Sequence, residues 1–483
     1  MGVKATARGA LLGLALALAL AAEPIMALAT DDVNLLPNEQ HFLDSSSSKT
    51  FGGGVKSGSA LNLAAVGQND LGSRGFNGDV FVYKHFAYVG RWGFFDSSHP
   101  QFCPSGGVAV LDARDPAHPE MVANLEVPGA SHEDVVVYTA PYGPLAGHDI
   151  AAVGLQVCSV FRTDSAAAGK RGLGLWDVSN PASPVLLSIF DTGCCTRGFH
   201  ELEVGQRTDL GKTLVYASLP YAERLESDGV TLRDRAHRGE AWIVDVTDPV
   251  HPAFVSSFGI RKDLGLDPAL GQGCFARAFG HGMDPSEDGH LLFVSYWDAG
   301  FISLNVSDPW HPAYLGRFTY AADEDGDAHS TSYDDQRKLL FTADEDFCKT
   351  GPAIVPGWGY MRVLNESDPT HPVQIGAFHT QNSYGLSDPG AGDYVIHNPL
   401  VVGSDIYISW YTDGVRVVST RDPRNPVEVA YFVPPAAQNP IKPAQRSTLT
   451  NTTQVWGVAY DYSTKLVYAS DMNSGLWILT RTD

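Results

Sequence analysis

A short turn motif recurs in seven copies along the chain and limits what the chain can fold into. In its clearest copy, residues 300–312, a hydrophobic stretch is followed by Asp308-Pro309-Trp310-His311-Pro312 and a second hydrophobic stretch. Asp or Asn at the first position accepts hydrogen bonds from backbone N–H groups two residues on, and the following Pro presets φ for a type I turn. The second Pro suits an edge strand, where a missing N–H donor costs little. The other copies are at Asp115-Pro116, Asn180-Pro181, Asp248-Pro249, Asp368-Pro369 and Asp422-Pro423, and the last stops at Asp483.

Each copy lies within a unit of four short strand-like stretches. In the first unit these are Asp79 to Tyr83, Phe86 to Arg91, Val108 to Asp112 and Glu120 to Glu126. Short strands separated by turn residues favour antiparallel four-stranded sheets, and 49 Gly and 30 Pro supply such turns. Radial repetition of these sheets predicts an all-β, seven-bladed β-propeller.

The two ends of the chain are expected to meet in one blade. The stretch 60–66 resembles the outer strands that follow each turn, such as 184–190, whereas the C-terminus stops before its own outer strand. An N-terminal strand that replaces the missing one would complete the last blade. The sequence therefore predicts a single propeller over residues 55–483.

The N-terminus has the features of a secretion signal. Lys4 and Arg8 precede an apolar run, Ala10 to Ala22, that is too short to span a bilayer, and residues 27–29 are small enough for a signal peptidase. We expect a signal peptide at 1–29, a flexible leader at 30–54, and a secreted, periplasmic or cell-surface protein. A retained membrane anchor is the alternative for the first segment, and no later stretch is long enough to cross a membrane.

Charge and cysteine content narrow the partners and the compartment. The net charge of −22 repels nucleic acid phosphates, so nucleic acid binding is not expected. In an exported protein, six cysteines predict disulfides whose pairing the sequence does not decide. Free thiols or metal ligands are the alternative for this set: Cys103, Cys158, Cys194, Cys195, Cys274 and Cys348.

The repeat resembles a known family. The stretch Ala241-Trp242-Ile243-Val244-Asp245-Val246-Thr247-Asp248-Pro249 is similar to the LVIVD repeat of exported bacterial β-propellers. The resemblance covers nearly all of the chain after the signal segment. It implies a seven-bladed ring, but it implies no shared activity and no catalytic residues.

One face of the predicted ring carries long loops. Segments are inserted between the second and third strands at 92–106, 158–171, 220–239 and 343–358, and all six cysteines fall in loops of this face. Because function is usually carried by loops on a rigid scaffold, this face is the expected working surface.

Histidines recur at two places in the repeat. One set lies inside the turns and is interpreted as turn residues: His118, His251, His311 and His371. The other set opens the innermost strand of five blades: His132, His200, His281, His329 and His397. Imidazoles gathered around one axis can bind copper, zinc or iron. Alternatively, each of these histidines fastens its own blade through a backbone hydrogen bond.

Carboxylates cluster near two of these histidines and form a weak calcium candidate: Asp323, Asp325, Asp327, Asp344 and Asp346. An acidic, solvated loop is the alternative. Glu133 and Glu201 each follow a histidine of the second set directly, so strand alternation predicts that they point away from it.

These features leave three hypotheses of function. The first is a binding or scaffold protein that presents its loop-rich face to a protein or a glycan. The second is a metal-dependent oxidoreductase or hydrolase at the channel mouth, and the third is a calcium-stabilised structural protein. No Gly-x-Ser-x-Gly, His-Glu-x-x-His or phosphate-binding loop occurs in the sequence to favour an enzyme.

Overall fold

In the computed structural model, short β-strands joined by turns follow one another along the chain. The strands belong to the unit Asn34–Asp483, whereas the other unit, Met1–Val33, lies outside the described residues together with the predicted signal segment. The described residues are 36, 39, 43–92, 106–157, 170–193, 196–220, 239–267, 271, 277–321, 324–347, 358–387, 390–437 and 453–483. Within these ranges, no helix has the length and hydropathy needed to cross a bilayer.

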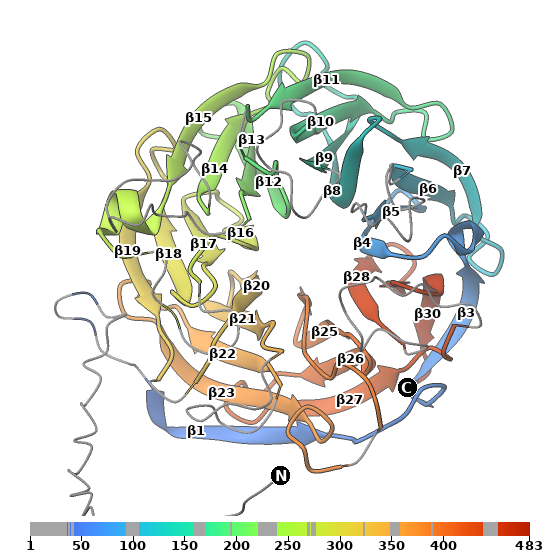
Figure 1. Ribbon diagram of the computed structural model, residues 1–483, viewed down its shortest axis with the longest axis vertical. Helices are drawn as coiled ribbons and strands as arrows, with labels where there is room; N and C mark the ends of the chain where they lie inside the picture. Colours follow the sequence, from blue (N-terminus) through green and yellow to red (C-terminus); the bar gives the residue numbers. More distant parts are fainter. Residues whose placement is uncertain are drawn as a thin grey trace, which may run out of the picture. The chain divides into compact units, whose positions relative to one another are not determined.

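The described unit is an all-β, propeller-like fold of four-stranded antiparallel blades arranged around a central axis (Figure 1). Two sheets are simple meanders: β12 (Leu202–Arg207), β13 (Lys212–Ser218), β14 (Ala241–Asp245) and β15 (Ala253–Phe258), then β16 (Met283–Pro285), β17 (Leu291–Ser295), β18 (Phe301–Asn305) and β19 (Ala313–Phe318). The two short helical turns that are described are η1 (Leu71–Ser73) and η3 (Ile260–Leu264).

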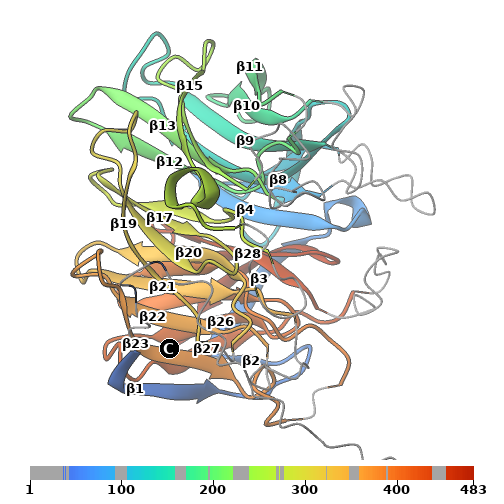
Figure 2. The ribbon, with the colours of Figure 1, turned by 60° about the vertical axis from the view of Figure 1, so that its left-hand side comes forward.

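Two further sheets contain the same meander and gain an N-terminal strand at the outer edge. They are β20 (Ala328–Asp334), β21 (Leu339–Asp344), β22 (Met361–Asn365) and β23 (Val373–Thr380) with β1 (Leu43–Gly52), and β24 (Pro399–Val402), β25 (Asp405–Trp410), β26 (Gly414–Ser419) and β27 (Val427–Phe432) with β2 (Ala60–Leu61). β1 runs parallel to β23, and Figure 2 shows the two strands side by side. Residues 43–52, which we expected in a flexible leader, therefore form a strand. Their Ser-rich sequence has no hydrophobic alternation, and the pairing uses backbone groups that the edge of β23 leaves free.

The expected seven separate sheets are not observed, because hydrogen bonding joins the strands into six. One sheet has eight strands: β4 (Asn77–Tyr83), β5 (Phe86–Arg91), β6 (Val108–Asp112), β7 (Glu120–Leu125), β8 (Ala130–Thr139), β9 (Asp149–Val157), β10 (Gly172–Asp177) and β11 (Val185–Asp191). Its two halves, β4–β7 and β8–β11, are joined through the pairing of Arg91 with His132. Single bridges also link neighbouring sheets elsewhere: Gln156 with Gly198, Trp297 with Ala328, and Tyr411 with Val455.

The N-terminal strand completes the last sheet, as the sequence predicted. This sheet contains β28 (Val455–Asp461), β29 (Leu466–Asp471), β30 (Gly475–Arg481) and β3 (Leu63–Asn69). β3 pairs antiparallel with β30, so the third strand of the described unit and its last strand share one sheet.

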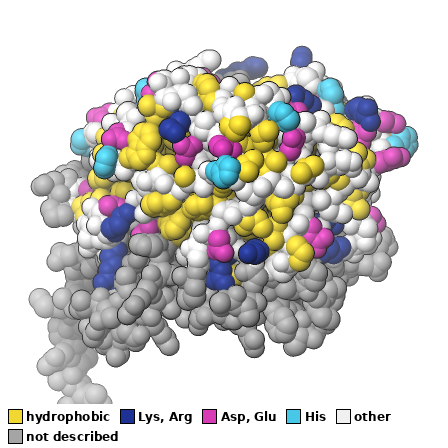
Figure 3. All heavy atoms as spheres, turned by 90° about the horizontal axis from the view of Figure 1, so that it is seen from above, with side chains coloured by type: hydrophobic (Ala, Val, Ile, Leu, Met, Phe, Trp, Pro, Cys, Tyr) yellow, Lys and Arg dark blue, Asp and Glu magenta, His cyan; other side chains and the backbone are white. Residues whose placement is uncertain are grey.

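Apolar side chains fill the space between neighbouring sheets. One core cluster joins Ala152 and Leu175 of the eight-stranded sheet to Val215 and Val244 of the next sheet, all of them fully buried. The outer strands instead leave apolar residues exposed, among them Val185, Phe254 and Val427. Figure 3 shows apolar side chains between acidic and basic ones on one side of the molecule.

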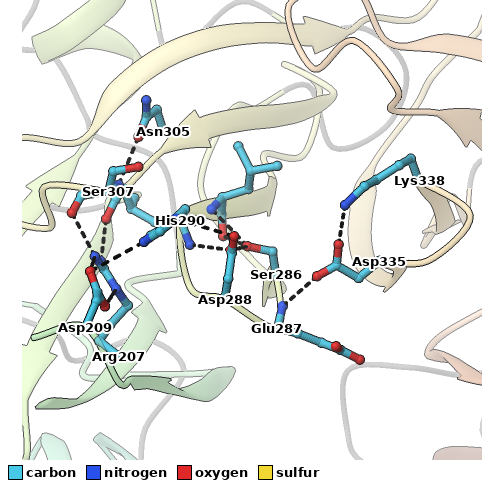
Figure 4. A network of polar contacts seen from close by, with 12 residues as sticks. Arg207, Asp209, Ser286, Glu287, Asp288, His290, Asn305, Ser307, Asp335 and Lys338 are labelled. Atoms are coloured by element: carbon cyan, nitrogen blue, oxygen red, sulfur yellow. Dashed lines mark hydrogen bonds and ion pairs between the residues drawn. The ribbon is translucent and has the colours of Figure 1, made fainter. Parts of the chain in front are cut away.

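The recurrent turns have the hydrogen bonds that the sequence predicts. The Asp308 carboxylate accepts from the Trp310 N–H at 3.0 Å, and the Asp248 carboxylate accepts from the Val250 N–H at the same distance. The exposed His311 lies 2.8 Å from Asp308, which confirms that it is a turn residue. The turns also hold neighbouring units together, because the buried Arg207 donates to the carbonyl oxygens of Val306 and Ser307 (Figure 4).

Candidate functional site: a buried histidine ring

Four of the five histidines predicted to open innermost strands converge at one place. The ring centroids of His200 and His281 are 4.6 Å apart, those of His281 and His329 are 4.0 Å apart, and those of His329 and His397 are 4.2 Å apart. All four side chains are buried. We call these four residues the histidine ring. Its place at the start of the innermost strands follows the prediction.

The histidine ring lies at the end of the strands opposite the recurrent turns. His200 precedes the first residue of β12, whereas Arg207 ends β12 and contacts the turn at Ser307. Backbone hydrogen bonds fix the histidines to the second strand of their own sheets: His281 N–H donates to Ser295 O at 2.8 Å, and His397 N–H donates to Ser409 O at 3.0 Å. The scaffold thus sets the positions of the imidazoles.

His132 stays outside the histidine ring and has a structural role. Its Nε2 accepts a hydrogen bond from the Val127 N–H at 2.9 Å. Burial, together with the nearby cations Arg91 and Arg74, lowers the pKa of His132 to about 3, so the imidazole is neutral and can accept. This contact supports the alternative interpretation for His132, in which the histidine fastens the fold through a backbone hydrogen bond.

Two glutamates point toward the histidine ring, each toward histidines of the following sheets. Glu201 Oε1 lies 3.4 Å from His281 Nδ1 and 3.5 Å from His329 Nε2, and Glu133 Oε2 contacts His200 Nδ1. Both glutamates lie where strand alternation is interrupted, because Glu201 precedes β12 and the register of β8 shifts between His132 and Val135.

Burial favours the neutral form of two imidazoles of the histidine ring. It lowers the pKa of His200 and that of His329 well below the usual range, and the neighbouring His281 lowers both further. Burial also raises the pKa of Glu133 well above its usual range, with a further rise from the Glu201 carboxylate. Neutral imidazole is the form that binds metal ions.

An acidic cavity of about 350 Å³ adjoins the histidine ring. Its lining includes four carboxylic acids, Asp79, Asp134, Glu201 and Glu203, together with Asn398. Burial raises the pKa of Asp134 to about 7, and Glu201 contributes to the rise. Glu201 lines this cavity and also contacts His281 and His329. A small molecule in the cavity would therefore lie next to the imidazoles.

Aromatic side chains pack against the histidine ring. Trp456 lies 4.3 Å from His397 between ring centroids and donates from Nε1 to Glu133 at 2.9 Å. Trp297 lies 5.4 Å from His281 between ring centroids, with the two rings tilted by 35°. These buried residues help to keep the imidazoles apart from solvent.

The predicted calcium residues separate into two groups. Asp344 accepts hydrogen bonds from Tyr320 and Arg362, each at 2.8 Å, so this carboxylate is paired with a cation. Asp325 and Asp327 instead meet Asp298, which comes from the β17–β18 hairpin. Asp346 is close enough to raise the pKa of Asp327, and Asp323 lies outside the described residues.

The six cysteines and most of the inserted loops cannot be compared with the prediction. Cys103, Cys158, Cys194, Cys195, Cys274 and Cys348 all lie outside the described residues. The segments 93–105, 158–169, 221–238 and 348–357 lie outside them as well.

Comparison with known proteins agrees with the class that the fold defines, a β-propeller-like protein built from repeats. The LVIVD repeat family matches residues 167–192, which include β10 and the turn before β11. No curated protein matches the chain.

Many solved chains resemble this fold. A chain of the structure "Crystal Structure of Mitotic Checkpoint Complex" is 11% identical, with a TM-score of 0.47, and the match covers 98% of this chain and 100% of that chain. The match to "Crystal structure of Chaetomium thermophilum Raptor" has 9% identity and a TM-score of 0.50, and it covers 87% of this chain. This chain spans 29% of the Raptor chain. At such identities, the likeness concerns the fold alone.

Sequence reasoning missed three residues of these clusters. Glu133 and Glu201 were expected only to point away from the histidine that each follows, and Asp298 was not singled out. The adjacency of Glu133 to His132 and of Glu201 to His200 was the available signal, since each His-Glu pair recurs at the same place in the repeat.

Proposed function

We propose that the histidine ring binds one divalent transition-metal ion, copper, zinc or iron. The observation that carries the proposal is the Glu201 carboxylate. Its Oε1 is buried and makes no hydrogen bond, although it lies 3.4 Å and 3.5 Å from nitrogens of His281 and His329. A buried acceptor without a donor is costly, and a cation between these atoms would remove that cost.

The spacing of the donor atoms supports this proposal. Metal–nitrogen bonds of about 2.0–2.1 Å in a tetrahedral site place neighbouring ligand atoms about 3.3 Å apart. The distances from Glu201 to the two imidazoles are close to this value. The ligand atoms of His200, Glu201 and His281, and those of Glu201, His329 and His397, also lie within 4.8 Å of one another. Imidazole and carboxylate donors together suit zinc, copper and iron.

The adjoining acidic cavity supports an enzymatic form of the proposal, a metal-dependent oxidoreductase or hydrolase. A substrate in the cavity would reach the metal on the side of Glu201. The four carboxylic acids of the cavity favour a neutral or cationic substrate over an anionic one.

Elemental analysis of the purified full chain, together with titration of the chelator-treated protein with Zn²⁺, Cu²⁺ and Fe²⁺, tests this proposal. We expect about one metal ion per chain in the wild type. His281→Ala and His329→Ala should each lower the affinity for the metal by roughly tenfold or more. His311→Ala removes an exposed turn histidine and is the matched control. Absence of bound metal in the wild type, with no heat on titration, would refute the metal site.

We also propose that the chain is an exported seven-bladed propeller. The eight-stranded sheet supports a count of seven blades, because its halves β4–β7 and β8–β11 are joined by the single pairing of Arg91 with His132. Single bridges of this kind also link sheets that are separate elsewhere in the fold. Contacts between the innermost strands β4, β8, β12, β16, β20, β24 and β28 also form a closed cycle. The basic and apolar N-terminal segment supports export, and N-terminal sequencing of protein recovered outside the cytoplasm, beginning near residue 30, is the test.

A second candidate function is binding of a protein or a glycan by the loop-rich face. The inserted loops and their cysteines support it, since disulfides would pin long loops on a rigid ring. Mass measurement under non-reducing conditions tests the disulfides. Loss of binding on a glycan array after deletion of 221–238, with the metal content retained, would assign the function to this face.

A further inference from the structure

We propose a second cation site, for calcium, formed by Asp298, Asp325 and Asp327 and separate from the histidine ring. A carboxylate oxygen from each residue lies within 4.8 Å of the others, and the exposed fractions of the three residues are 4%, 3% and 0%. The donors come from two segments that are separated in the sequence, the β17–β18 hairpin and the connection before β20. Their meeting is therefore a property of the tertiary structure.

Asp327 supplies the observation that points to a ligand. Both of its carboxylate oxygens are fully buried and have no hydrogen-bond partner, and the carboxylate faces Asp298 and Asp325. An isolated buried carboxylate is very costly, and one surrounded by other carboxylates is more so. A bound cation would offset both costs.

The donor set selects the kind of cation. All three residues offer oxygen, whereas the histidine ring offers mainly nitrogen. Calcium takes six to eight oxygen ligands at about 2.3–2.6 Å in flexible geometry, and carboxylates that bind through one or both oxygens can supply them. Magnesium needs a near-ideal octahedron and keeps several waters, which suits a fully buried carboxylate such as Asp327 less well. We therefore assign the site to calcium.

The position of the site indicates what the ion would do. Ala328 alone separates Asp327 from His329, and its backbone exchanges hydrogen bonds of 3.1 Å and 3.2 Å with Trp297, the neighbour of Asp298. Asp327 has a φ of +60°, in the left-handed region that few residues other than glycine adopt. Calcium bound here would hold the start of β20, and hence His329, in place.

Calorimetric titration of the chelator-treated full chain with CaCl₂ tests the site. We expect about one Ca²⁺ per chain, with a Kd between about 10⁻⁶ and 10⁻³ M, and a rise in melting temperature on addition of CaCl₂. Asp327→Asn and Asp325→Asn should each weaken Ca²⁺ binding by roughly tenfold or more, and each should abolish the rise in melting temperature. Asp308→Asn is the matched control, because Asn180 occupies the equivalent turn position naturally.

Several outcomes separate this site from the histidine ring. Calcium binding that persists in His281→Ala confirms that the two sites use different donors. If CaCl₂ produced neither heat nor a thermal shift in the wild type, or if Mg²⁺ bound as tightly as Ca²⁺, the calcium assignment would be wrong. Binding that survives Asp327→Asn and Asp325→Asn unchanged would place the ion elsewhere. Asp327→Asn should also raise the melting temperature in chelator, because it removes an uncompensated carboxylate.

Discussion

The carboxyl group of Glu366 makes the stability of the fold depend on pH. Glu366 occupies the position before the recurrent turn that Ala113, Val178, Val246 and Val306 occupy in other units, and all five residues are buried. Its Oε2 accepts a hydrogen bond from Ser303 at 3.2 Å, while Oε1 is buried without a partner. Burial raises its pKa from 4.5 to about 8, and Asp368 contributes to the rise, whereas the Ser303 hydrogen bond opposes it.

The sign and size of the effect follow from this shift. Above pH 4.5 the unfolded chain releases the Glu366 proton, whereas the folded protein retains it up to about pH 8. The unfolded state is therefore favoured progressively as pH rises through this window. At pH 7 the cost is about 3 kcal/mol, and between pH 5 and pH 9 the free energy of unfolding falls by about 4 kcal/mol through this group alone.

Glu366→Gln tests this reasoning, because the amide has the shape of the protonated acid and can still accept from Ser303. We expect the variant and the wild type to have similar stability at pH 5, and the variant to be more stable by about 4 kcal/mol at pH 9. Urea unfolding followed by tryptophan fluorescence at five pH values gives the difference curve. The exposed Glu287→Gln controls for removal of a negative charge. A difference that stays constant from pH 5 to pH 9 would refute the argument.

Two other predictions concern contacts that stabilise single units. His132→Ala should lower the free energy of unfolding by about 1–3 kcal/mol, because the buried Val127 N–H loses its acceptor, while metal content should stay unchanged; urea unfolding and elemental analysis check both parts. Arg416→Met should cost about 3–5 kcal/mol, because the buried guanidinium pairs with Asp413 at 2.9 Å and with Glu428 at 2.8 Å. Thermal melting measures this loss, and an unchanged melting temperature would show that the two carboxylates are compensated by other groups.

The sequence by itself determined the repeat unit and where its turns lie. Asp308-Pro309 and its equivalents specify turns through local hydrogen bonds and a fixed φ, so their geometry needs no distant partner. The same local pattern placed the histidines at the start of the innermost strands and predicted that β3 would complete the last sheet. These features depend on neighbours in sequence or on comparison of one unit with another.

The tertiary structure alone decided which of these residues share a site. His132 and His200 occupy the same place in the repeat, yet His132 accepts from Val127 while His200 joins the histidine ring. Alternation along a strand did not predict Glu201, because this residue precedes the strand, and its orientation depends on packing between sheets. Asp298 meets Asp327 only because neighbouring sheets bring their loops together. Distances across the central axis depend on the closure of the ring, and no local pattern encodes them.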